Sequence, residues 1–228
     1  MIIGICGLIG SGKDTIAAHL TQKYDYQRYS WATPLKDIAS VLFGWDRDML
    51  EGTTSELRAA REQRDDWWSD KLGKEWSPRY ALQYVGTEVM RNSLHPDIWV
   101  LAGQRRIASM DNVVIPDTRF PNEIAAIREM GGEVWQVNRG EKPEWVREFS
   151  LYRSRVLNNR WTSDDLHAFM AQYYPHVHAS EFSWHGMPVD AVIENDGSVD
   201  DLRSKIDAVV KVKVSIKNQQ LDLSYLRA

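Results

Sequence analysis

The first fifteen residues restrict the fold more than any other stretch of the chain. Residues 2–6, IIGIC, form a short apolar run between glycines, which is typical of a strand buried in a parallel sheet. From Lys13 onward, apolar residues recur at steps of three and four, which predicts a helix. A glycine-rich turn separates the two. A strand, a glycine turn and a helix in this order indicate an α/β fold on a parallel sheet.

The rest of the chain repeats this alternation of strands and helices. Four more strands are predicted, at 26–32, 112–117, 133–139 and 190–196. Prolines at the first turn predict helices that start near Thr33, Ser77 and Pro96. We therefore predict an α/β three-layer sandwich, in which a parallel sheet has helices on both faces.

Three segments interrupt or extend this pattern. Residues 140–186 are rich in arginine and histidine and are predicted to form a helical insertion, and residues 46–76 a second, partly exposed helical insertion. The alternation in 211–216 predicts an edge strand or a partner-binding arm. We expect one domain over 1–228, with both insertions belonging to it.

Composition excludes several classes of protein. The 228 residues carry a formal net charge of −4, so broad electrostatic binding to a nucleic acid polymer is not expected. No run approaches the roughly 18 apolar residues of a membrane span. The single cysteine, Cys6, cannot form an intrachain disulfide, which fits a reducing, cytoplasmic location.

The glycine turn carries the strongest chemical signal. Gly7, Gly12 and Lys13 give the pattern G-x-x-x-x-G-K after a predicted strand and before a predicted helix. Glycines let successive backbone N–H groups point inward and form an anion nest, and the helix adds its positive end. Lys13 supplies a positive charge to the β- and γ-phosphates of a nucleotide.

Asp14 departs from the usual loop, which has Ser or Thr after the lysine to bind Mg²⁺. The carboxylate could bind Mg²⁺ itself, directly or through water. Alternatively, Thr15 takes the metal, and Asp14 faces the second substrate and holds Lys13 or an arginine. A third interpretation is an acidic residue that merely stabilises the first turn of the helix.

Other candidate residues follow the later elements. Asp117 and Arg119 come directly after a predicted strand, at the edge of the sheet where open α/β folds bind ligands. Arg79 and Gln83 lie four residues apart on one helical face, and Lys36 lies on the helix after Thr33. Arginines recur every third residue at Arg58, Arg61 and Arg64. For these three we favour the interpretation that they form surface ion pairs with neighbouring acidic residues. The four histidines of 167–185 lack the spacing of a zinc site.

Seven of these stretches together resemble bacteriophage deoxynucleoside monophosphate kinases, in the order that the family has them. The Lys-Asp-Thr ending of the loop is itself a feature of this family. The matching stretches are SGKDT at 11–15, PLKD at 34–37, RYALQYVGTE at 79–88, WV at 99–100, IPDTRFPNE at 115–123, HASE at 178–181 and ENDGSVDDL at 194–202.

The resemblance implies a P-loop nucleoside-monophosphate-kinase fold and a phosphotransferase. The reaction would move the γ-phosphoryl group of ATP to a deoxynucleoside monophosphate (dNMP) with Mg²⁺, in the host cytoplasm if a phage encodes the protein. It implies Lys13, Asp14 and Arg119 as catalytic residues and Thr15 or Asp14 as metal ligands, with the arginines of 139–160 in a closing lid. The ATP-binding residues would be Gly10, Ser11, Gly12, Lys13, Asp14 and Thr15. The dNMP-binding residues that match are Lys36, Arg79, Gly86, Trp99, Asp117 and Arg119, with Glu123 a weaker match, whereas 46–76 and the tail after 210 show no match. Two further dNMP-binding candidates come from the residues themselves: Gln83, which could read a base edge, and Arg64, which could hold the phosphate.

One departure and two alternatives accompany the resemblance. Family members carry a basic residue just before Ser-Gly-Lys, where this chain has Ile9 and Gly10. The missing charge would come from Arg119 or a lid arginine, or else ATP binds more weakly. The alternatives are a P-loop kinase of another metabolite, such as dephospho-coenzyme A, and a non-catalytic module gated by ATP. The expected partners are small nucleotides, and the resemblance suggests a homodimer.

Overall fold

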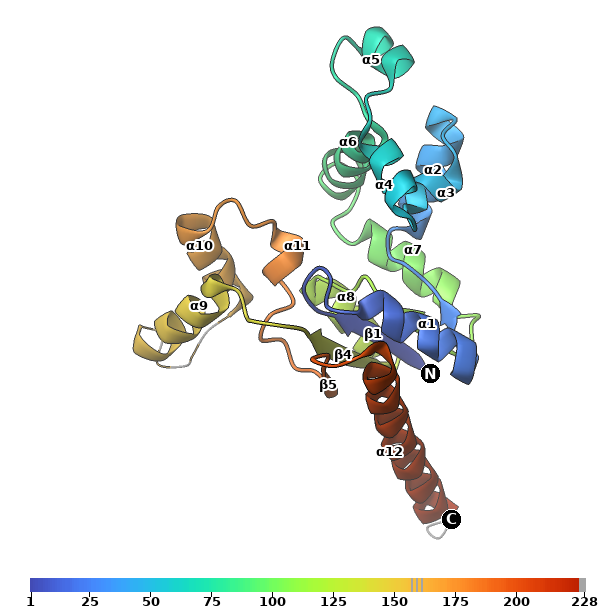
Figure 1. The fold of residues 1–228 in the computed structure, drawn as a ribbon, viewed down its shortest axis with the longest axis vertical. Coiled ribbons are helices and arrows are strands. Elements are labelled where there is room, and N and C mark those ends of the chain that lie inside the picture. Colours follow the sequence, from blue (N-terminus) through green and yellow to red (C-terminus); the bar gives the residue numbers. More distant parts are fainter. Residues whose placement is uncertain (157, 159, 161, 226–228) are drawn as a thin grey trace. The chain divides into compact units, whose positions relative to one another are not determined.

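The computed structural model describes the whole chain except residues 157, 159, 161 and 226–228 (Figure 1). The chain divides into two compact units. The first unit consists of residues 1–28 and 111–228, and the second of residues 29–110. In the part of the chain that is described, no helix is long and apolar enough to cross a membrane.

The first unit contains a five-stranded sheet in the order β2-β3-β1-β4-β5. Every neighbouring pair of strands is parallel, which confirms the predicted α/β class. The strands are β1 (Ile2–Cys6), β2 (Gln27–Arg28), β3 (Val113–Ile115), β4 (Glu133–Asn138) and β5 (Ala191–Glu194).

The four strands after β1 are all shorter than predicted, β4 by one residue and β5 by three. β2 has two residues rather than the seven of 26–32, because Tyr29 and Trp31 belong to the second unit. There, Trp31 packs so closely on Gly103 that any side chain at that glycine would collide with its ring. β3 ends before Pro116, which has no N–H group to donate to a neighbouring strand.

Helices cover both faces of the sheet. On one face α1 (Lys13–Tyr24) and α12 (Val199–Tyr225) contact each other and share a buried core with β1, including Leu20 and Ile206 against Ile3 and Ile5. Gly4 points to the opposite face, because side chains alternate along a strand. There it lies against Ile127 of α8 (Pro121–Glu129). The structure thus has the predicted three layers.

The predicted edge strand at 211–216 is wrong, because α12 continues through it to Tyr225. Leu202, Ile206 and Val210 are buried at helical spacing, and no glycine or proline interrupts 199–225. Asp207 also ties α12 to α1: its carboxylate accepts hydrogen bonds from Lys23 and Tyr24 and lies 2.7 Å from His19 Nε2.

The described residues of 140–186 form three helices with an apolar core of their own. They are α9 (Glu144–Arg155), α10 (Ser163–Tyr173) and α11 (Ala179–Phe182). Trp145, Phe149, Leu166 and Phe182 are buried in this core, and Leu8 of the glycine turn packs against it. The insertion therefore reaches the turn that follows β1.

The second unit is helical throughout its secondary structure. Its core contains Trp45, Leu50 and Trp76. Arg64 lies beyond the end of α4, so the predicted row of three arginines on one helix is wrong. The elements are α2 (Thr33–Phe43), α3 (Arg47–Glu51), α4 (Ser55–Glu62), α5 (Asp66–Leu72), α6 (Pro78–Gln83), the π-helix η1 (Tyr84–Arg91) and α7 (Ile98–Ile107).

Candidate active site

The glycine turn has the backbone that an anion-binding loop needs. Gly7, Gly10 and Gly12 have φ angles of 152°, 74° and 108°, which disfavour residues with a side chain. A Cβ at Gly7 would lie 2.5 Å from the Val137 carbonyl oxygen, and one at Gly12 would lie 2.6 Å from the Asn195 amide nitrogen. Gly7 and Gly12 are therefore required by conformation and by close packing, and Gly10 by conformation alone.

Asn195 fixes the end of this loop. It follows β5, is buried, and its side-chain amide donates a hydrogen bond of 2.9 Å to the Ser11 carbonyl oxygen. Asn195 lies in the stretch 194–202 that resembles the kinases, but the sequence does not reveal its role. Only the fold shows the role, because 184 residues separate the two partners.

Lys13 is folded back onto the loop. Its Nζ donates hydrogen bonds of 2.8 Å to the Gly7 carbonyl and 2.7 Å to the Leu8 carbonyl. Burial lowers the pKa of Lys13, and the positive charge of Arg119 lowers it further, while Glu181 and Asp14 oppose this shift. The ammonium group is therefore held at the loop, and Arg119 is close enough to act on it.

Asp14 points to solvent at the start of α1, with 78% of its side chain exposed. Its Oδ1 accepts a hydrogen bond of 2.5 Å from the guanidinium of Arg28, at the end of β2. An arginine beside Asp14 was one of the predicted alternatives, and the structure identifies it as Arg28. The neighbouring Thr15 is half-buried.

Ser11 is the one loop side chain that is fully enclosed, with 2% of its surface exposed. Among the described residues its hydroxyl has no hydrogen-bond partner. A buried hydroxyl usually has a hydrogen-bond partner, so this hydroxyl is suited to bind a polar ligand of the loop.

The turn after β3 brings Arg119 close to the helical insertion. The Glu123 carboxylate accepts hydrogen bonds from the backbone N–H groups of Arg119 and Phe120, at 2.7 and 3.1 Å, and thereby caps α8. The Arg119 guanidinium donates to Ser180 Oγ at 3.2 Å and lies 3.8 Å from Glu181. Asp117 is half-buried in the same turn.

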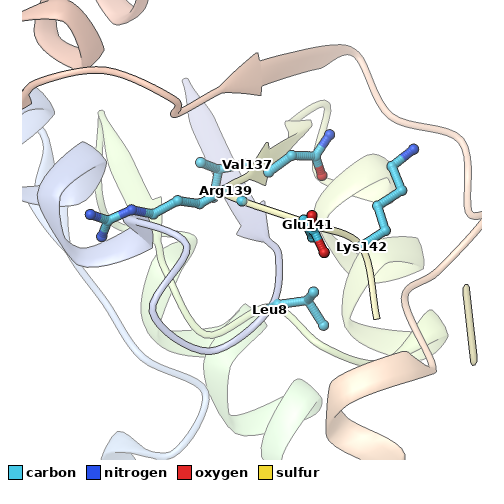
Figure 2. Close-up of a pocket in the computed structure, with 7 residues that line it drawn as sticks. Leu8, Val137, Arg139, Glu141 and Lys142 are labelled. Carbon is cyan, nitrogen blue, oxygen red and sulfur yellow. The ribbon is translucent and has the colours of Figure 1, made fainter. Parts of the chain in front are cut away.

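A second arginine approaches the glycine loop from the end of β4. Arg139 donates a long hydrogen bond of 3.4 Å to the Gly10 carbonyl. Figure 2 shows the Arg139 side chain pointing to the left and the Lys142 side chain pointing upward, at a small pocket that Leu8 also lines. Arg139 thus contacts the loop at Gly10, the residue after Ile9.

The remaining predicted residues lie in the second unit, and three of them are ion-paired. Lys36 pairs with Glu51 at 2.9 Å, Arg79 with Glu62 at 3.2 Å, and Arg64 with Asp66 and Asp70. In the same unit Gln83 is exposed at the end of α6.

Gly86 and Trp99 are brought together. The Trp99 indole donates a hydrogen bond of 3.0 Å to the Gly86 carbonyl, and Leu35 packs on the Gly86 backbone. Trp99 is only 5% exposed, so in this conformation its ring serves packing.

No cluster of three or more His, Cys, Asp or Glu side chains suitable for a metal ion occurs in the described ranges. A magnesium ion that binds mainly to phosphate and water does not need such a cluster. Thr15 and Asp14 remain the side chains of the loop that could hold it.

No protein-family model matches the sequence. The chain is 34% identical to a putative deoxynucleotide monophosphate kinase of Acanthamoeba polyphaga mimivirus, over 61% of this chain and 74% of the relative. This chain belongs to the deoxynucleotide monophosphate kinase family. The deoxynucleoside-5′-monophosphate kinase of Escherichia phage T5 is 29% identical over 57% of this chain and 72% of its own. The deoxynucleotide monophosphate kinase of Enterobacteria phage T4 is 25% identical over 92% and 99%.

Solved structures similar to this fold include two small-molecule kinases. A gluconokinase from Sinorhizobium meliloti 1021 has 10% identity and a TM-score of 0.41 over 96% of each chain. A shikimate kinase from Aquifex aeolicus vf5 has 11% identity and a TM-score of 0.36, over 97% of this chain and 99% of its own. These TM-scores are too low to support a fold assignment. The assignment to the P-loop fold therefore rests on the strand order and the glycine loop of the protein itself.

Proposed function

We propose that the protein is a deoxynucleoside monophosphate kinase, which transfers the γ-phosphoryl group of ATP to a dNMP and forms ADP and a dNDP. The observation that carries this proposal is the loop between β1 and α1. It has left-handed glycines, an enclosed hydroxyl without a partner and Lys13 folded onto its carbonyls. Membership of the family supports the choice of acceptor.

The ATP phosphates would bind to the loop from Gly10 to Thr15. The backbone N–H groups and the positive end of α1 favour anions there. Lys13 would exchange its two carbonyl partners for phosphate oxygens, and the Ser11 hydroxyl would gain a partner. Arg139 would add the charge that is absent at Ile9, since it already contacts the loop.

Magnesium would be held by Thr15, with Asp14 as the alternative ligand. When bound, the ion neutralises phosphate charge during the transfer. The pairing of Asp14 with Arg28 favours Thr15, because the carboxylate already has a cationic partner. Arg28 would in turn offset the repulsion between Asp14 and the phosphates of ATP.

In the first unit the proposed acceptor residues are Asp117 and Arg119. Asp117 and Arg119 lie at the carboxyl end of β3, the edge at which open α/β sheets bind ligands. In the second unit the proposed residues are Lys36, Arg64, Arg79, Gln83, Gly86 and Trp99. Since Lys36, Arg64 and Arg79 are paired with carboxylates, a nucleotide phosphate would compete with those acids for them.

The transfer itself requires positioning and charge neutralisation more than a strong base. Closure of the helices in 140–186 would exclude water, which otherwise accepts the phosphoryl group.

We also propose a homodimer in solution, which sedimentation velocity would test.

The decisive experiment measures ADP release from ATP with each of the four common dNMPs, their ribonucleotide counterparts and dephospho-coenzyme A. The expected result is release that depends on a dNMP. Release with dephospho-coenzyme A alone would replace the proposed acceptor. Tight ATP binding without any acceptor-dependent release would identify a binding module instead of an enzyme.

A further inference from the structure

Glu181 of α11 directs its carboxylate at the glycine loop. Its Oε2 accepts a hydrogen bond of 3.4 Å from the backbone N–H of Ile9, in the middle of the loop. Its Oε1 lies 3.8 Å from the Arg119 guanidinium. A carboxylate that receives a loop N–H and faces an arginine occupies the surroundings of a bound phosphate group.

Lys13 is influenced by the same carboxylate. The negative charge of Glu181 raises the pKa of Lys13, against the effects of burial and of Arg119. The loop amide, the lysine and the arginine all favour anions, and Glu181 provides a negative charge to all three. Phe182, next to Glu181, anchors α11 in the apolar core of the insertion.

The contact also links the insertion to Arg119. Ser180, the neighbour of Glu181, accepts a hydrogen bond from the Arg119 guanidinium, and its hydroxyl lies 2.9 Å from His178 Nδ1. While Glu181 and Ser180 hold Arg119, the guanidinium is directed at α11. Loss of both contacts would free Arg119 for a phosphate.

We propose that Glu181 lowers the affinity for nucleotides, because its carboxylate occupies the place of a phosphate group at the loop. ATP must displace this carboxylate to bind. This inference rests on the proposed ATP site. Displacement would move α11 away from Ile9 and release Arg119, so phosphate binding and the position of the insertion would be coupled.

The test compares the binding of ATP and of inorganic tripolyphosphate by calorimetry. Glu181→Gln removes the charge and keeps the shape of the side chain, and Glu144→Gln, exposed in the first turn of α9, is the matched control. The expected result is binding about three- to fivefold tighter for Glu181→Gln with both ligands, the size of effect typical of a partly exposed charge. Glu144→Gln should bind like the wild type.

Salt separates competition from a structural role. The gain in Glu181→Gln should shrink as ionic strength rises, because added ions screen the carboxylate. Unchanged or weaker binding by a folded Glu181→Gln variant, or a gain that salt does not alter, would overturn the inference. Failure of the proposed function would give another result. Glu181→Gln would still bind tripolyphosphate more tightly than the wild type, but no dNMP would stimulate ADP release.

Discussion

Arg28 and Asp14 form an ion pair of 2.5 Å across the start of α1, between the end of β2 and the residue that follows the loop lysine. Asp14 replaces the hydroxyl that phosphate-binding loops usually carry after the lysine. Without a partner, its charge would repel the phosphates that the loop attracts. Arg28 therefore accounts for how an acid is tolerated at this position.

Arg28→Gln should weaken ATP binding. The substitution leaves the Asp14 charge unbalanced beside the phosphates, and both side chains are well exposed, so we expect a rise in the KM for ATP of about three- to fivefold. Steady-state kinetics with varied ATP would measure it. Adding Asp14→Asn to Arg28→Gln should restore part of the loss, whereas Arg203→Gln, in an exposed pair on α12, should change nothing. A double variant that is worse than Arg28→Gln would contradict the explanation.

The sequence predicted the parts of this site that are local. β1, the glycine loop and α1 are adjacent in the chain, so spacing and hydrophobic pattern were sufficient for them. Arg28 and Asn195 were missed because their roles depend on partners 14 and 184 residues away. β2 was predicted too long for a related reason: its apolar continuation, Tyr29 and Trp31, is buried in another unit rather than in the sheet.

Lys13→Ala should abolish most of the proposed kinase activity. The ammonium group is held at the loop and would neutralise charge on the transferred phosphoryl group, so kcat should fall by about 10³-fold or more. The thermal midpoint should change little, because the lysine contacts only loop carbonyls. Lys211→Ala, on the exposed side of α12, is the control. Near-normal turnover of dGMP or dTMP by Lys13→Ala would refute the assignment of the loop.

Asn195→Ala should lower both stability and ATP affinity. The change leaves the Ser11 carbonyl without its buried donor, which costs about 1–3 kcal/mol of unfolding free energy. Urea denaturation would measure this loss, and calorimetry would measure weaker ATP binding by the loosened loop. Asn92→Ala removes an exposed side chain–side chain hydrogen bond and should be close to neutral in both measurements. Equal effects of the two substitutions would show that Asn195 does not fix the loop.

His185 should make the helical insertion sensitive to acid. Burial, together with the positive charges of Lys142 and Arg153, lowers the pKa of His185 from 6.5 to about 4. The unfolded chain therefore binds a proton between these values that the folded chain does not, so the free energy of unfolding falls as pH decreases from about 6.5 to 4. The full shift corresponds to a loss on the order of 3 kcal/mol. Denaturation curves across this range would measure it.

A matched pair of variants isolates this histidine. His185→Gln removes the titrating group, so its unfolding free energy should fall less steeply between pH 6.5 and 4 than that of the wild type. His176→Gln, exposed on the same insertion, should keep the wild-type slope. The ring centroids of Trp145 and Trp184 lie 5.3 and 5.9 Å from that of His185. Tryptophan fluorescence should therefore report the protonation of His185 directly. Identical pH slopes for His185→Gln and the wild type would mean that another group controls the acid response.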